Sequence, residues 1–160
     1  MTQPSSAERG AAVRFPPPLI YVLWVLAGVG MHYVVARAAL PLNRTALAAC
    51  GLAIVAIGVG IVASARIHFT RTGQSPIPWK PSPELILQGP YTFTRNPMYV
   101  GVTIIQIGVG VGFNNLWISL FAPLALLTVH FVAVLPEEQY LSEKFGDSYK
   151  TYLTRVRRYL

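Results

Sequence analysis

Two polar clusters in this 160-residue chain have the residue types needed for ligand chemistry. One is a turn with Arg95, Asn96 and Tyr99, and the other is the pair Glu137 and Glu138. A guanidinium binds a carboxylate or phosphate through paired hydrogen bonds, and a glutamate accepts bonds from adjacent ribose hydroxyls or attracts a cationic centre. A nucleotide-like ligand with a carboxylate fits both clusters. The competing interpretation is structural: Arg95 anchors to lipid headgroups and Glu137 caps a helix.

Four apolar runs in the chain have the length and composition of bilayer-spanning helices, which need roughly 20 residues for a hydrocarbon core about 30 Å thick. None of them contains Asp, Glu, Lys or Arg, and 53% of the chain is hydrophobic. The sequence therefore predicts an all-α, polytopic membrane protein with four transmembrane helices. The predicted spans are residues 16–36, 45–65, 97–113 and 116–135.

The first run has an alternative interpretation as a secretory signal, because residues 36–38 loosely fit a small-residue cleavage site. A signal core has about 7 to 15 apolar residues, whereas this run is longer and three more follow it. We therefore prefer a retained helix. Residues 1–15 are expected to form a disordered tail, and residues 16–160 a single membrane-embedded domain.

The last two apolar runs are separated only by Asn114 and Asn115, which predicts a tight antiparallel hairpin. Each polar cluster lies at the base of one arm, so the two clusters are expected to meet on the same side of the membrane. Pro123 should kink the second arm.

Small residues recur at helical spacing in the second and third runs. This pattern indicates faces where helices approach closely without a hydrophobic driving force. The predicted packing residues are Ala56, Gly60, Ser64, Gly108 and Gly112.

Basic residues are distributed unevenly between the two sides that four spans would define. Of the 13 Lys and Arg residues, all but Arg37 and Arg44 fall in the N-terminal tail, the connection 66–96 or the C-terminal segment. The positive-inside rule then places the termini and the site on the cytosolic side, at the inner membrane if the source is bacterial. Contact with anionic membrane lipids explains the net charge of +7, and we predict no nucleic-acid partner.

The connection 66–90 is rich in proline and glycine, which excludes a regular helix through most of it. It also carries apolar residues, among them Trp79, Leu85 and Ile86. Loops of this length are usually functional or disordered, and the apolar residues favour an ordered lid over the site, at the membrane interface.

The segment after the fourth run begins with Pro136, which predicts a new helix with Glu137 and Glu138 near its positive end. Apolar and aromatic residues then recur every three or four positions. This spacing predicts a C-terminal amphipathic helix that lies on the anionic membrane surface. The stripe consists of Leu141, Phe145, Tyr149, Tyr152 and Val156.

The sequence does not predict a metal site. Cys50 is the only cysteine, which excludes an intramolecular disulfide and a Cys-based zinc site. The three histidines are scattered along the chain. His68 is the best of them for the pocket, whereas His32 and His130 are expected to hydrogen-bond neighbouring helices.

Two motifs carry a family resemblance over about residues 50–158. They are Gly-Pro-Tyr-x-x-x-Arg-Asn-Pro-Met-Tyr-x-Gly at residues 89–101 and Glu-Glu-x-x-Leu-x-x-x-Phe-Gly-x-x-Tyr-x-x-Tyr at residues 137–152. With the hairpin between them, they resemble the isoprenylcysteine carboxyl methyltransferase family and its phospholipid N-methyltransferase relatives. The resemblance implies a membrane-embedded methyltransferase that uses S-adenosylmethionine, releases S-adenosylhomocysteine and methylates a lipidic or small hydrophobic acceptor.

The same resemblance implies the site residues. The cofactor would be held by residues from the loop, the turn and the first glutamate, with Arg95, Tyr99 and Glu138 as candidate catalytic residues. A polar cofactor would enter from the cytosol and the acceptor from the bilayer. The implied cofactor-binding residues are Gln74, Leu85, Ile86, Tyr91, Arg95, Asn96, Pro97, Met98, Tyr99, Glu137 and Glu138.

Two positions depart from the isoprenylcysteine pattern. Asn96 stands where those enzymes usually have histidine, and this is the form that resembles phospholipid methyltransferases. Ala133 stands four residues before the first glutamate, where those enzymes carry an arginine implicated in holding the substrate carboxylate. A prenylated cysteine is therefore a doubtful acceptor.

Two other functions are weighed against the methyltransferase. Sterol and steroid reductases share an Arg-His-Pro-x-Tyr turn and a Phe-Gly-x-x-Tyr tail, and they use NADPH. They generally have more spans, and a 2′-phosphate requires additional basic contacts. A small membrane scaffold or lipid-binding protein is the third possibility, in which Arg95 and Glu137 are only structural. Cofactor binding distinguishes the three.

Overall fold

Helices account for most of the computed structural model, which describes residues 10–13, 15–35, 38–73, 75, 77 and 79–159. No β-strand occurs within these residues, which confirms the all-α prediction. The elements are α1 (Pro17–Val34), α2 (Arg44–Arg71), the 3₁₀-helix η2 (Gly89–Thr92), α3 (Pro97–Gly112), α4 (Leu116–Leu120), α5 (Ala122–Val129), the π-helix η3 (His130–Val134) and α6 (Leu135–Arg155).

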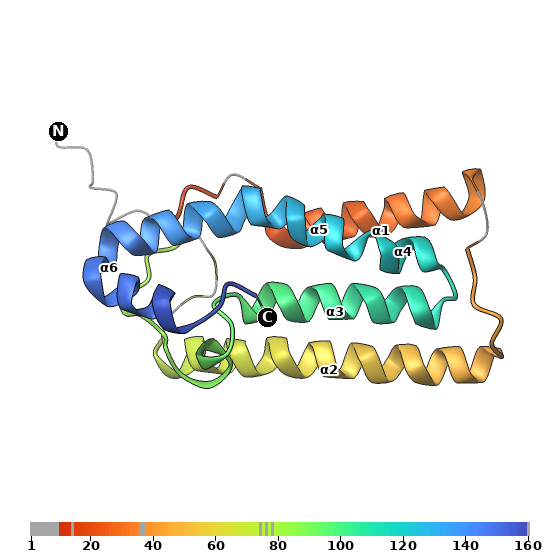
Figure 1. Ribbon diagram of the computed structural model, residues 1–160, viewed down its shortest axis with the longest axis horizontal. Coiled ribbons are helices and arrows are strands. Elements are labelled where there is room, and N and C mark those ends of the chain that lie inside the picture. The colour runs from red at the N-terminus through yellow and green to blue at the C-terminus, as the bar shows by residue number, and fades with distance from the viewer. Residues whose placement is uncertain are drawn as a thin grey trace.

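The helices form an elongated bundle (Figure 1). The α2 helix packs along α3, and α1 packs against α4 and α5. At one end α6 extends beyond the other helices and then turns back, so the C-terminus returns to the beginning of α3 (Figure 1). This turned-back end is where the two polar clusters meet.

Three helices in the described part of the chain are long and apolar enough to cross a membrane: Pro17–Val34, Arg44–Arg71 and the nearly continuous Leu116–Arg155. The remaining predicted span forms α3, a shorter apolar helix of 16 residues. At 1.5 Å per residue it is about 24 Å long, less than a hydrocarbon core of about 30 Å. The count of four spans therefore stays a prediction.

The α3–α4 connection is the predicted tight turn. Asn114 adopts a positive φ of 52°, a conformation that asparagine tolerates better than most residues. Gln106 donates a hydrogen bond to the carbonyl of Ile118 (3.1 Å), and Ser119 donates one to the carbonyl of Ile107 (2.9 Å). These bonds hold the two arms together, so both polar clusters lie at the open end of the hairpin.

Glycines bring α2 and α3 into close contact. A Cβ built on Gly51 would lie 2.4 Å from the Gly112 Cα, and one on Gly58 would lie 2.6 Å from the Gly101 carbonyl oxygen. The predicted packing role of Gly108 is correct, because its Cβ would lie 2.8 Å from the Val55 nitrogen. Backbones this close leave no room for side chains.

The predicted packing face of α2 was wrong. Ala56 and Gly60 are exposed, and a Cβ on Gly60 would meet nothing within 4 Å. The helix carries two stripes of small residues, and the buried one consists of Gly51, Gly58 and Ala65. Spacing alone does not distinguish the stripes, because the position of α3 decides which of them is covered.

Replacing Gly51 with alanine should therefore destabilise the protein. The new methyl group would overlap the α3 backbone, and overpacking of this kind typically costs about 1–3 kcal/mol. Gly60→Ala is the matched control, because it adds the same methyl group to the same helix in open space. Thermal unfolding in detergent should show a lower Tm for the first variant only, and equal Tm values would contradict the close α2–α3 contact.

The fourth apolar run continues directly into α6, with helical backbone angles at the junctions between α5, η3 and α6. The predicted kink falls at Phe121, between α4 and α5, with Pro123 in the first turn of α5. The prediction that a new helix begins at Pro136 was wrong, because the chain before it is already helical, with φ −63° and ψ −46° at Val134. The π-turn of η3 is the kind of local adjustment that carries a helix past a proline. Glu137 and Glu138 therefore do not lie at a free helix N-terminus.

Gly146 reverses the direction of α6. Its φ of 52° and ψ of −124° are non-helical and lie in a region that glycine enters readily. Because of this reversal, Tyr149 and Tyr152 are buried at 2% and 8% exposure instead of lying on a membrane surface. The predicted surface-bound amphipathic helix is thus a folded-back segment that helps to enclose a cavity.

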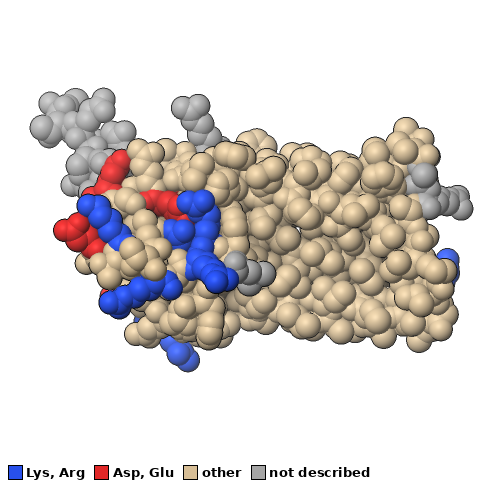
Figure 2. All heavy atoms as spheres, in the orientation of Figure 1, with Lys and Arg blue, Asp and Glu red and all other residues tan. Residues whose placement is uncertain are grey.

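Charged side chains gather at the α6 end of the face shown in Figure 2, and nearly all of the remaining visible surface is uncharged. Arg44 begins α2 and Arg71 ends it, so the helix, about 42 Å long, separates these two arginines. Which end faces the cytosol stays a prediction.

The predicted disordered tail mostly lies outside the described residues. Within it, Ala11 and Val13 are buried at 3% and 9% exposure. They belong to a core cluster with residues of α1, α5, η3 and α6, including Tyr21 and Ala133. This cluster joins α1 to the rod formed by α5, η3 and α6.

Candidate active site

A cavity of about 400 Å³ lies at the charged end of the bundle, within the range of about 300–1,000 Å³ typical of small-molecule sites. Its walls come from α1, α2, η2 and the loop before it, the turn before α3, the first residues of α3, and the two parts of α6 on either side of Gly146. The structure brings these predicted site residues together around it: Leu85, Ile86, Tyr91, Arg95, Asn96, Pro97, Met98, Tyr99 and Glu137.

Three other candidates are placed differently. Gln74 lies outside the described residues. Glu138, predicted to be catalytic, does not line the cavity. His68 does not line it either, and its Nδ1 is 2.7 Å from the carbonyl oxygen of Ser64 on its own helix.

Glu137 and Tyr99 form the polar centre of the cavity. The Tyr99 hydroxyl donates a 2.6 Å hydrogen bond to Glu137 Oε1, which joins α3 to α6. Tyr21 of α1 donates to the Tyr99 carbonyl at 3.0 Å and also contacts the Thr103 hydroxyl at 3.0 Å. The carboxylate therefore has a defined orientation before any ligand binds.

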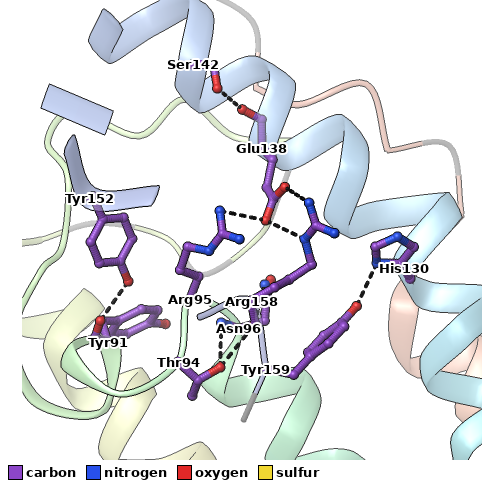
Figure 3. Close-up of polar contacts among 10 residues, drawn as sticks. All are labelled: Tyr91, Thr94, Arg95, Asn96, His130, Glu138, Ser142, Tyr152, Arg158 and Tyr159. Atoms are coloured by element: carbon purple, nitrogen blue, oxygen red, sulfur yellow. Dashed lines mark hydrogen bonds and ion pairs between the residues drawn. The ribbon is translucent and has the colours of Figure 1, made fainter. Parts of the chain in front are cut away.

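Arg95 is held on the cavity wall by Glu138 (Figure 3). Its NH1 is 3.2 Å from Glu138 Oε1, and both side chains are nearly buried, at 11% and 13% exposure. Arg158 binds the same carboxylate through two bonds of 3.0 and 2.8 Å, and these bonds raise the pKa of Arg158. Arg95 Nε is buried and has no hydrogen-bond partner in the described structure, so one donor on this wall is unused.

The described part of the proline-rich loop forms the lid side of the cavity. Apolar residues of the loop, including Ile77 and Trp79, line it beside Leu85 and Ile86. Ser82 is tied to α6 because its backbone N–H donates to the Tyr140 hydroxyl at 3.1 Å. The loop is shorter than predicted, because α2 continues to Arg71.

Aromatic rings surround the polar centre. Tyr152 donates a 2.7 Å hydrogen bond to the Tyr91 carbonyl, and both residues line the cavity with Tyr149. Burial raises the pKa of the Tyr91 phenol, and the nearby Glu137 raises it further. Tyr91 is therefore neutral at ordinary pH and presents an electron-rich ring.

Sequence reasoning missed several lining residues. Tyr21 belongs to α1, which was interpreted only as a membrane span. Val62, Arg66 and Phe69 form one face of α2, and their spacing of four and three was a signal that the face is continuous. The predicted connection included Arg66, whereas this residue lies within α2.

Comparison with known proteins places this site in a family. Residues 46–148 match the family model described as phospholipid methyltransferase. The chain belongs to this family. The matched range includes most of α2, the lid, the turn before α3 and both glutamates, so most of the cavity walls lie within it.

The chain is also 35% identical over 72 residues to the Protein-S-isoprenylcysteine O-methyltransferase of Schizosaccharomyces pombe. The match covers 45% of this chain and 30% of that relative, so the chain spans less than a third of the relative's length in this comparison. Together, the two findings confirm the resemblance to membrane methyltransferases that the motifs predicted.

Proposed function

We propose that the protein is an integral membrane methyltransferase that uses S-adenosylmethionine to methylate a lipidic or small hydrophobic acceptor. The observation that carries this proposal is the cavity itself, in which the Arg95–Tyr99 turn and Glu137 meet inside mostly apolar walls. Residues 16–160 would act as one membrane-embedded domain, with the cavity at the cytosolic side.

The residues around the cavity suit the cofactor. Glu137 can accept hydrogen bonds from ribose hydroxyls, and Tyr99 holds it in place. The rings of Tyr91, Tyr149 and Tyr152 suit a sulfonium, because aromatic faces attract cations. Leu85, Ile86 and the Asn96–Met98 turn supply apolar and backbone surface. When bound, S-adenosylmethionine supplies an electrophilic methyl group.

The carboxylate of the cofactor has two arginines available. Arg95 keeps a buried, unused Nε donor although its NH1 pairs with Glu138. Arg66 is exposed on α2, lines the cavity and makes no ion pair within the described structure. A guanidinium at this position suits a carboxylate or phosphate at the membrane interface.

The reaction requires alignment more than acid–base chemistry, since a methyl group leaves a sulfonium by in-line displacement. An amine acceptor must also lose a proton. Glu138, His68 and Tyr99 have groups that could assist, but of these three only Tyr99 lines the cavity, and its hydroxyl donates to Glu137. We therefore assign Tyr99 to a proton relay, in which its oxygen accepts the amine proton while its own hydroxyl proton passes to Glu137 Oε1, and we assign Arg95 to orientation. Glu138 acts through Arg95.

Isothermal titration calorimetry in detergent tests the proposal. S-adenosylhomocysteine should bind the purified, folded protein with one-to-one stoichiometry, because one cavity contains both clusters. NADPH is the comparison ligand, and it should not bind, because Arg66 and Arg95 are the only basic residues among the described lining residues and a 2′-phosphate requires additional basic contacts. No detectable binding of S-adenosylhomocysteine at millimolar concentration would refute the methyltransferase proposal, and binding of NADPH alone would favour a reductase.

A further inference from the structure

The C-terminal residues after α6 run beside the turn that carries Arg95 and Asn96. The Arg95 backbone N–H donates to the Arg157 carbonyl at 2.9 Å. The Arg158 carbonyl accepts two further bonds, from the Thr94 hydroxyl at 3.1 Å and from Asn96 Nδ2 at 3.0 Å. Both cavity residues of the turn are therefore bonded to the chain terminus.

The Arg158 side chain makes a second set of contacts, with α6. Its guanidinium binds Glu138 through a two-pronged pair, and Glu138 in turn contacts Arg95 (Figure 3). A planar fork on a carboxylate fixes the orientation of both groups. Glu138 is thus oriented from one side by Arg158 while it holds Arg95 from the other.

Tyr159 anchors the segment to a third element. Its hydroxyl lies 2.9 Å from His130 Nδ1 in the π-helix η3 (Figure 3). Residues 157–159 therefore connect the turn before α3, the part of α6 before Gly146, and η3. Neither Arg158 nor Tyr159 lines the cavity.

We propose that residues 156–159 form a C-terminal latch and that Arg158 is a positioning residue for the cavity. It keeps Arg95 and Asn96 in their binding geometry by holding Glu138 with its side chain and the turn with its carbonyl. This inference rests on the proposed function for its effect on cofactor affinity. Its structural part stands independently, because the bonds are present without a ligand.

The chain contains a matched control for Arg158. Arg157 is its neighbour and carries the same charge, but its side chain is exposed and only its carbonyl contacts the turn. Arg158→Gln and Arg157→Gln therefore remove equal charge, and only the first removes the fork on Glu138. Arg158→Lys keeps the charge without the planar fork and provides a second variant if the glutamine form folds poorly.

Two measurements on the full chain in detergent test the latch. Hydrogen–deuterium exchange of residues 93–100 without ligand reports on the turn, and calorimetry with S-adenosylhomocysteine reports on the cavity. We expect Arg158→Gln to speed exchange and weaken binding by about ten-fold each, as for loss of a charged hydrogen bond. Arg158→Lys should have a smaller effect in the same direction, and Arg157→Gln should match the parent.

The two measurements separate the latch from the function. If the parent does not bind S-adenosylhomocysteine, the proposed function fails while the exchange rates still test the latch. Exchange in Arg158→Gln or Arg158→Lys equal to that in Arg157→Gln would overturn the latch. Faster exchange with unchanged affinity would overturn the positioning role.

Discussion

Glu137→Gln should weaken binding of S-adenosylhomocysteine by about 10- to 150-fold, the equivalent of the 1.5–3 kcal/mol typical of a hydrogen bond to a charged group. Glu137 is the proposed ribose acceptor, and Tyr99 already orients it. Glutamine has nearly the same shape and can still accept from Tyr99, so the fold should be retained. Calorimetry in detergent measures the change.

Glu143→Gln is the control for this prediction. Glu143 lies on the same helix, is exposed, and accepts a hydrogen bond from Gln139 (3.0 Å). Its substitution changes the net charge by the same amount and should leave the affinity unaltered. If both variants bind as tightly as the parent, Glu137 is a structural residue and the cofactor lies elsewhere.

The second prediction concerns the molecule that accepts the methyl group. A farnesyl-cysteine carboxylate should be a poor substrate, and a neutral or amine-bearing lipid should be a better one. Ala133, at the position where the isoprenylcysteine enzymes carry arginine, is fully buried in the core and offers no polar group. An acid group left unpaired on burial costs on the order of 1–3 kcal/mol, or roughly ten-fold or more in affinity.

Transfer of label from S-adenosylmethionine measures this preference. The acceptors are a farnesyl-cysteine derivative, phosphatidylethanolamine and a total lipid extract, and the label should enter the lipids. Methylation of the farnesyl-cysteine carboxylate alone would show that the argument from Ala133 is wrong. Comparing Arg66→Gln with Arg71→Gln would then tell whether Arg66 holds the carboxylate, because only Arg66 lines the cavity.

The sequence by itself determined the helical architecture and the residues that meet at its charged end. Long uncharged apolar runs have few alternatives to helices, because backbone polar groups must be satisfied internally in a membrane. The short connection at Asn114 and Asn115 then leaves only a hairpin, which brings the turn before α3 close to Glu137. The motifs on either side of the hairpin also sufficed to identify the family.

Only the tertiary structure decided which of several similar sequence features contacts another helix or the cavity. The α2 helix has two small-residue stripes, and the contact with α3 selects the one with Gly51 and Gly58. A glycine such as Gly146 permits a chain reversal but does not by itself require one. In the structure, the reversal of α6 accompanies the packing of Tyr149 and Tyr152 at the cavity. Adjacent glutamates look alike in sequence, but a helix rotates consecutive residues by about 100°, so Glu137 faces the cavity and Glu138 faces Arg158.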